Sequence, residues 1–253
     1  MSSSRSGATL FIAFAFVLLV STITRLGMDK TGLKVVSVYH TDKRPGSIRE
    51  VALLLSLLVG LASVLVMIVI FFASEGLAEL ISLPDDKLST AVIFLSLPLI
   101  SLSFIFSEVL RGMRLIGLSS FIQLIVPYGA AIILIWSAYY LSAGGPLSGA
   151  MAFCSGFGLA VLLGSYFILK ATTACSAPVF SHYPSVARGA PFVLWSSLIL
   201  YALSSGDIVI LGYFVPSDQV AYYFAASRTA MLISVGLVGI NSIVAPMIAS
   251  AYK

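Results

Sequence analysis

The chain of 253 residues is 59% hydrophobic and only 9% charged, whereas soluble domains carry roughly a quarter charged residues. This composition excludes a soluble globular protein, because no polar stretch is long enough to fold around a core of its own. The formal net charge of +4 comes from scattered basic residues, so no nucleic-acid-binding face is predicted.

Seven apolar segments follow one another along the chain, and each is predicted to cross a membrane once as a helix. They are residues 8–24, 51–73, 91–107, 121–141, 150–169, 192–215 and 220–245. A bilayer core needs about 20 helical residues, and roughly 17 suffice. Helices are the expected form because unpaired backbone groups are costly in lipid. The predicted fold is all-α, a single polytopic membrane helix bundle of about seven transmembrane helices.

The first segment, 8–24, has an alternative interpretation as a signal peptide, because it follows the basic stretch MSSSR. The end of this segment and the residues that follow, together STITRLGMDK, contain no small-x-small cleavage site. We therefore interpret 8–24 as a transmembrane helix.

Basic residues are distributed unevenly among the connections, and basic connections stay in the cytoplasm. Eleven of the fourteen Lys and Arg residues fall after segments 8–24, 91–107 and 150–169 or at the C-terminus: Arg25, Lys30, Lys34, Lys43, Arg44, Arg49, Arg111, Arg114, Lys170, Arg188 and Lys253. This asymmetry predicts a cytoplasmic C-terminus and, with seven spans, an N-terminus outside. A preceding helix, or unaided transfer of the short N-terminal tail, would account for that N-terminal location.

The sequence gives little support to an enzyme or a cofactor site. Cys154 and Cys175 have neither disulfide-framework nor metal-ligand spacing, and no G-x-x-x-x-G-K-[ST] motif for nucleotide binding is present. A membrane-embedded polymerase or glycosyltransferase would need a large polar loop with clustered catalytic groups, and the connections after 51–73, 121–141 and 192–215 are short. We expect no enzyme, no cofactor and no metal.

Two charged residues interrupt the last two segments. Asp207 precedes the turn PSDQ, residues 216–219, and Arg228 follows it, each at the same number of residues from the turn. In an antiparallel helical hairpin both would lie roughly 13 Å below the turn, level with each other near the middle of the bilayer. Intramembrane charges face the bundle interior or a wet cavity and usually have partners. The pair is either a structural ion pair between helices or part of a polar cavity wall.

Other polar residues are candidates for the same cavity. Gln123 and Asn241 are expected to line it, although polar side chains also bridge helices for structural reasons. Glu108 and Arg111 lie at the cytoplasmic end of segment 91–107, where a substrate headgroup would first be met. Positive-inside anchoring is the alternative for Arg111.

Anchoring is the preferred interpretation for Arg114 and Lys34. Pro98, Pro127 and Pro246 are compatible with the broken helices of transporters.

Three stretches resemble one family. Residues 25–36 read RLGMDKTGLKVV, residues 109–120 read VLRGMRLIGLSS, and the last two segments combine an aspartate, a glycine, an acidic turn, tyrosine, alanines, arginine and a later proline. These last are Asp207, Gly212, Asp218, Tyr223, Ala225, Ala226, Arg228 and Pro246. Together they are similar to the Wzx-type polysaccharide flippases of the multidrug, oligosaccharidyl-lipid and polysaccharide exporter superfamily.

The resemblance implies a transporter that moves lipid-linked oligosaccharide, of the polyprenyl diphosphate type, across the bacterial plasma membrane. It implies coupling to an H⁺ or Na⁺ gradient, and a polysaccharide polymerase or glycosyltransferase as partner. Members usually have twelve to fourteen spans, so the chain is expected to correspond to the family's helices two to eight, as an incomplete sequence. The alternatives are an ion-coupled drug or metabolite antiporter of the same superfamily, and a truncated bundle that needs a partner chain.

Overall fold

A computed structural model describes residues 2–25, 27–72, 87–141 and 146–172, together with isolated residues between 195 and 230. In the continuous ranges the chain forms α1 (Ser2–Thr24), α2 (Met28–Thr41), α3 (Pro45–Phe72), α5 (Lys87–Gly112), α6 (Ile116–Ser120), the π-helix η1 (Phe121–Ile125), α7 (Val126–Tyr140) and α8 (Pro146–Ala171). These described residues contain no strand, which confirms the all-α prediction.

Four of the predicted spans fall on helices that are long and apolar enough to cross a membrane: Pro45–Phe72, Leu88–Gly112, Ile116–Tyr140 and Leu147–Ala171. The protein is therefore a polytopic membrane protein. The predicted first span falls on α1, in which the shorter stretch Ala13–Thr24 is apolar. The predicted spans 192–215 and 220–245 fall on residues that are described only at isolated positions.

The helices extend beyond the predicted segments because hydropathy marks only the part of a helix that lies among acyl chains. α3 begins at Pro45 instead of residue 51, and proline is favoured in the first helical turn, where its missing N–H is not needed. α5 continues to Gly112 instead of residue 107. It is followed by Arg114 in a left-handed conformation, with φ of 62°, which ends the helical geometry.

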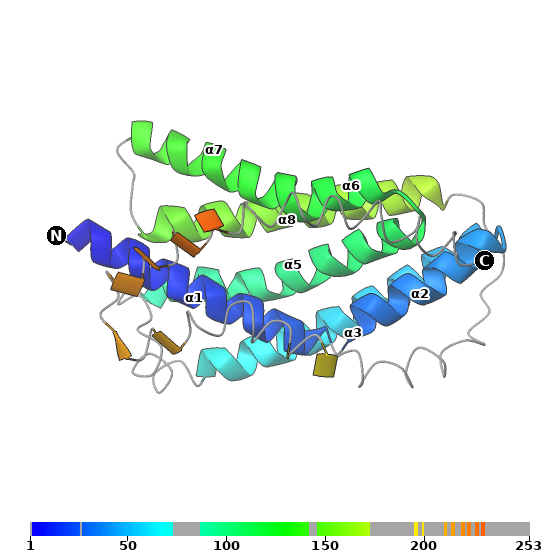
Figure 1. The fold of residues 1–253 in the computed structure, drawn as a ribbon, viewed down its shortest axis with the longest axis horizontal. Helices are drawn as coiled ribbons and strands as arrows, with labels where there is room; N and C mark the ends of the chain where they lie inside the picture. The colour runs from blue at the N-terminus through cyan, green and yellow to red at the C-terminus, as the bar shows by residue number, and fades with distance from the viewer. Residues whose placement is uncertain are drawn as a thin grey trace.

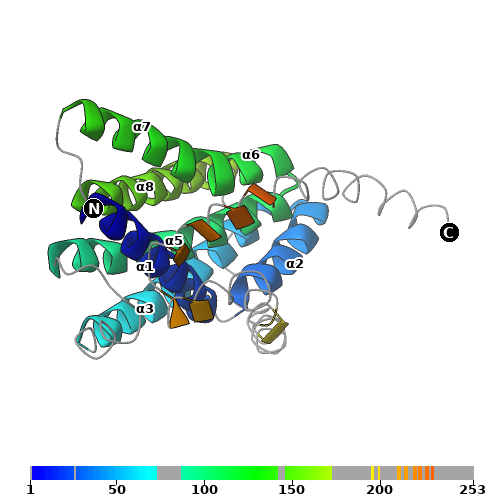
Figure 2. The same ribbon diagram turned by 60° about the vertical axis from the view of Figure 1, so that its left-hand side comes forward.

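α5 lies at the centre of the bundle. It packs against α1, α2 and α3 on one side and against α8 on the other, and α7 covers α8 (Figures 1 and 2). The periodicity of α3 shows how the sequence produces this arrangement. Ala52, Leu55 and Val59 are buried in the apolar cluster that α3 forms with α2 and α5, whereas Leu57 and Leu61 are exposed. An exposed side of this apolar composition is suited to contact with lipid.

Two apolar clusters occupy opposite halves of the bundle, and a polar layer separates them. The first cluster includes Val36, Leu55, Val59, Leu110 and Ile122, and the second includes Val17, Phe94, Leu97, Ile100 and Phe157. Between them, Thr24 of α1 and Ser101 of α5 join their hydroxyl oxygens at 2.9 Å.

The buried side of α5 is rich in serine: Ser89, Ser96, Ser101, Ser103 and Ser107 are all buried. Three of these hydroxyls donate to carbonyl oxygens of α5 itself: Ser96 to Ile93, Ser101 to Leu97 and Ser103 to Ile100. Small side chains of this kind let neighbouring helices approach α5 closely.

α7 and α8 approach each other closely at Gly156, where an added Cβ would overlap the backbone carbonyl of Pro127. A backbone neighbour cannot move aside as a flexible side chain can. We expect Gly156→Ala to destabilise the protein by about 1–3 kcal/mol, the usual effect of overpacking.

The thermal midpoint of the detergent-solubilised protein measures this effect, and Gly158→Ala is the matched control, because the nearest atom to an added Cβ there is Leu99 Cδ1 at 3.9 Å. Equal midpoints for the two variants would contradict the close approach of α7 to α8.

One expectation needs correction: residues 28–41, interpreted as part of a basic loop, form the helix α2. Val36 and Tyr39 are buried against α3 and α5, while Lys30, Lys34 and Val38 are exposed. The burial of Tyr39 raises the pKa of its phenol above its ordinary value. α2 is therefore an amphipathic helix whose apolar side docks on the bundle.

Candidate functional site

The last turns of α5 carry an acidic and a basic side chain on one face. Arg111 Nη1 donates to Glu108 Oε1 at 3.0 Å, and the three-residue spacing places both on the same side of the helix. The Glu108 side chain is 3% exposed, whereas the Arg111 side chain is 34% exposed. A carboxylate near a helix C-terminus is repelled by the partial negative charge there, so Glu108 depends on nearby cations.

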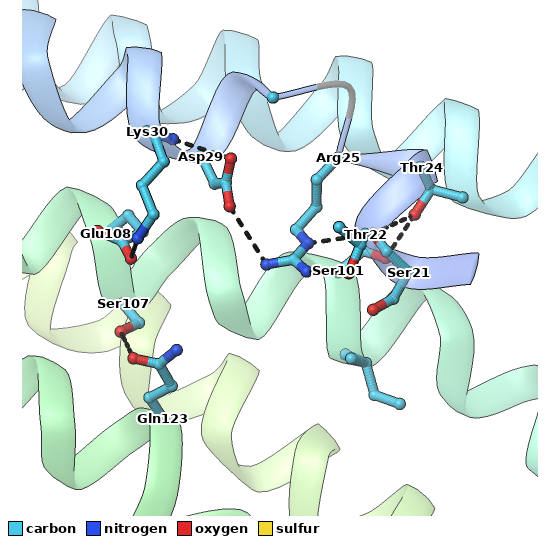
Figure 3. A network of polar contacts seen from close by, with 12 residues as sticks. Ser21, Thr22, Thr24, Arg25, Asp29, Lys30, Ser101, Ser107, Glu108 and Gln123 are labelled. Carbon is cyan, nitrogen blue, oxygen red and sulfur yellow. Dashed lines mark hydrogen bonds and ion pairs between the residues drawn. The ribbon is translucent and has the colours of Figure 1, made fainter. Parts of the chain in front are cut away.

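Lys30 supplies a second cation from α2. Its Nζ lies 2.5 Å from Glu108 Oε1, the same oxygen that Arg111 contacts. Figure 3 shows Lys30 reaching from α2 toward Glu108 on α5. Its side chain is 47% exposed. Among the described residues, the other carboxylate oxygen, Glu108 Oε2, is buried and has no hydrogen-bond partner.

Gln123 connects η1 to the same residues. Its Oε1 accepts hydrogen bonds from Arg111 Nη2 and from Ser107 Oγ, each at 3.1 Å. We refer to Lys30, Ser107, Glu108, Arg111 and Gln123 as the Glu108 cluster. It joins three elements, α2, α5 and η1, at one end of the bundle.

The π-helix η1 has a local cause in the sequence. Pro127 has no backbone N–H, so the carbonyl of residue 123 lacks its usual helical donor four residues later, and the proline ring crowds that carbonyl. A wider π turn accommodates both effects. Gln123 lies in the middle of this turn, and its side chain points toward Ser107 (Figure 3).

The Glu108 cluster carries an excess of positive charge. Lys30 and Arg111 share one carboxylate, so the three ionised side chains sum to one positive charge. The carboxylate is buried while both cations are partly exposed. The arrangement therefore offers cationic donors to an anion without requiring the carboxylate to leave its buried position.

A second set of polar side chains crosses the break between α1 and α2, and we refer to it as the Arg25 cluster. Arg25 Nη2 donates to Thr22 Oγ1 at 2.7 Å, Nε donates to the Ser21 carbonyl at 3.1 Å, and Nη1 pairs with Asp29 Oδ2 at 3.3 Å. The guanidinium also lies 4.3 Å from the Phe104 ring centroid. Arg25 and Asp29 are both buried, and Figure 3 shows their side chains pointing toward each other.

The break itself is formed by Gly27, which precedes α2 with φ of 70°. Glycine adopts this left-handed conformation without the steric cost that a side chain would add. The Arg25–Asp29 ion pair spans the break, and the Lys30 backbone N–H donates to Asp29 Oδ1 at 2.9 Å. The Arg25 cluster and the Glu108 cluster therefore meet at the neighbouring residues 29 and 30.

Comparison with models of known protein families matches residues 6–252 to the family described as polysaccharide biosynthesis protein. The chain belongs to this polysaccharide biosynthesis family. No curated protein and no solved structure matched the chain. The family match and the apolar helices together identify a membrane protein of the transporter type that takes part in polysaccharide biosynthesis.

In this member of the polysaccharide biosynthesis family, three of the predicted site residues come together. Glu108, Arg111 and Gln123 are joined directly through the Arg111 guanidinium. The other three, Asp207, Arg228 and Asn241, lie outside the described residues. Within the part of the chain that the structure describes, no group of three or more His, Cys, Asp or Glu residues could hold a metal ion.

Two parts of the site were not predicted from the sequence of this polysaccharide biosynthesis protein. Lys30 was assigned only to a basic connection, because residues 28–41 were not recognised as a helix. The signal was present, since Met28, Val35, Val36 and Tyr39 recur at helical spacing. The Arg25–Asp29 pair was also missed, because it spans the break at Gly27, where the spacing of a continuous helix does not apply.

Proposed function

We propose that the protein is a flippase that moves lipid-linked oligosaccharide, of the polyprenyl diphosphate type, across a bacterial plasma membrane. The observation that carries the proposal is the Glu108 cluster, in which Lys30 and Arg111 share one buried carboxylate and remain partly exposed. The chain's membership of the polysaccharide biosynthesis family supports this substrate class.

The chemistry of the cluster suits a diphosphate. The planar guanidinium of Arg111 offers several N–H donors in a fork that matches phosphate oxygens. Its Nη1 and Nη2 each use one hydrogen atom for Glu108 and Gln123, which leaves further N–H groups for a ligand. The Lys30 ammonium is a mobile point charge on a flexible stem.

The proposed orientation places the Glu108 cluster at the cytoplasmic end of the bundle. Lys34, Arg44, Arg49 and Arg114 are exposed on the helices and connections at this same end. Basic residues of this kind stay in the cytoplasm and contact anionic headgroups of the inner leaflet. A lipid diphosphate made in the cytoplasm would meet this end first.

Asp207, Arg228 and Asn241 are proposed to serve the later part of the path, near the middle of the bilayer. Arg228 would contact the diphosphate, and Asp207 would either release Arg228 or bind the coupling cation. The energy source is proposed to be an H⁺ or Na⁺ gradient. A polysaccharide polymerase or glycosyltransferase is the proposed partner that supplies or uses the lipid-linked oligosaccharide.

The test is a flipping assay with the full 253-residue chain in proteoliposomes. A fluorescent polyprenyl diphosphate oligosaccharide is placed in both leaflets, and a membrane-impermeant quencher reports the fraction that becomes accessible from outside. We expect the chain to increase exchange between leaflets over protein-free vesicles, and inorganic pyrophosphate to compete for binding. Exchange equal to that of protein-free vesicles would contradict the proposal.

One observation favours a second candidate function, an ion-coupled antiporter for cationic drugs or metabolites. Glu108 Oε2 is buried without a hydrogen-bond partner among the described residues, and a carboxylate oxygen of this kind is suited to a cationic ligand. A binding experiment with pyrophosphate as competitor distinguishes the two functions. A flippase binds lipid diphosphates in competition with pyrophosphate, whereas an antiporter binds cationic dyes that pyrophosphate does not displace.

We expect Arg228→Ala to lower flipping more than Arg114→Ala, because Arg228 is proposed to lie on the path and Arg114 is an exposed anchor after the end of α5. The same proteoliposome assay measures both rates at matched protein amounts. Equal losses would contradict the role proposed for Arg228.

A further inference from the structure

Lys30 and Arg111 bind the same oxygen of Glu108, yet they are not equivalent. Arg111 is held at two points, because Nη1 donates to Glu108 and Nη2 to Gln123. Lys30 is held at its ammonium by Glu108 Oε1, and its side chain is more exposed, at 47% against 34%. Of the two cations, Lys30 is therefore the one that an incoming anion draws away from Glu108 more easily.

When Lys30 leaves Glu108, the buried carboxylate still has Arg111 as its ion-pair partner. Arg111 lies on the same helix and stays within 3.0 Å of Oε1. A buried carboxylate with no cation would be strongly unfavourable, because the cost of desolvation would remain without compensation. The retained Arg111 pair makes the transfer of Lys30 from Glu108 to another anion energetically accessible.

The position of Lys30 connects this transfer to the break between α1 and α2. Lys30 lies in the first turn of α2, three residues after Gly27, and its backbone N–H donates to Asp29. Asp29 in turn pairs with Arg25 across the break. The Lys30–Glu108 ion pair thus fixes the first turn of α2 to α5 at the point where the α1–α2 angle is set.

We infer that Lys30 transfers from Glu108 to the diphosphate of the substrate, and that this transfer releases the first turn of α2 from α5 and changes the angle between α1 and α2. The inference rests on the proposed function, because it takes the diphosphate as the anion. It assigns Lys30 a role that the exposed Lys34, one turn later on the same helix, does not share.

The α1–α2 angle is measured with two spin labels in the full chain, one at Ile23 and one at Val38. Both positions are exposed, at 41% and 58%, and they flank the break. Cys154 and Cys175 are first replaced by serine so that only the introduced cysteines are labelled. Inorganic pyrophosphate is the probe, and its binding is followed in parallel by calorimetry.

We expect pyrophosphate to shift the distance distribution between the two labels. Lys30→Met should show the shifted distribution without pyrophosphate and should not respond further, while Lys30→Arg should respond as the unmodified chain does. Lys34→Met is the matched control and should also respond normally. A response that persists in Lys30→Met would overturn the inference.

Calorimetry separates the failure of this inference from the failure of the proposed function. Pyrophosphate that binds without any change in the label distance would overturn the release of α2 and leave the anion site of the flippase intact. Pyrophosphate that does not bind would overturn the anion site, and with it the inference.

Discussion

Replacement of Arg111 by alanine is expected to lower the flipping rate of lipid-linked oligosaccharide by about 30-fold, equivalent to a loss of about 2 kcal/mol of charge-assisted binding. Arg111 is the residue through which Glu108 on α5 and Gln123 on η1 are joined. Its removal takes away the forked donor and leaves the cluster without its excess positive charge. The proteoliposome assay measures the rate.

Two further variants keep this prediction separate from an effect on folding. Arg111→Ala leaves Glu108 with Lys30 as its remaining described ion-pair partner, which also destabilises the bundle. In the double variant with Glu108→Gln, the cluster has no buried carboxylate left to compensate, so stability should recover, while flipping stays low because the forked donor of Arg111 is still absent. Arg114→Ala should flip at nearly the normal rate. Equal rates for Arg111→Ala and Arg114→Ala would contradict a role for the Glu108 cluster.

Arg25→Ala is expected to lower the free energy of unfolding by about 3–5 kcal/mol, the usual cost of removing one partner of a buried ion pair. The change deletes the ion pair with Asp29, the hydrogen bonds to Ser21 and Thr22, and the contact with the Phe104 ring. Asp29 would stay buried without its cation. Thermal unfolding in detergent measures the effect.

Lys34→Ala is the control for Arg25, because it removes an exposed cation from the neighbouring helix and exposed substitutions usually change stability by less than about 0.5 kcal/mol. The double variant Arg25→Met with Asp29→Leu removes the buried charges together and should recover much of the loss. If the thermal midpoint of Arg25→Ala were close to that of Lys34→Ala, the Arg25 cluster would not stabilise the junction between α1 and α2.

The four long helices from α3 to α8 were predictable because lipid imposes one strong requirement on sequence. A transmembrane helix needs an apolar run of nearly fixed length, and that run is visible without any knowledge of the neighbouring helices. Their ends were less predictable, since Pro45 and Arg114 act through backbone geometry and not through hydropathy. α2 was missed because a search for long apolar runs does not detect a short amphipathic helix with lysines on its exposed side.

The types of residue in the candidate site were predictable from the sequence, whereas the contacts between their side chains were less so. Glu108 and Arg111 are close in sequence, so their pairing follows from helical spacing. The contact of Lys30 with Glu108 joins residues 78 positions apart and depends on how α2 docks against α5. Gln123 reaches Arg111 through a π turn, and no hydropathy pattern encodes that turn. The predicted pairing of Asp207 with Arg228 stays a prediction.

The serines on the buried side of α5 have a consequence for the biogenesis of the protein. The hydroxyls of Ser96, Ser101 and Ser103 donate to carbonyls within α5, so these three positions carry no unsatisfied donor even before neighbouring helices arrive. α5 is therefore able to leave the translocon and enter lipid as an independent helix over most of its length. Its last turns differ, because Ser107 and Glu108 take their partners from earlier and later segments of the chain.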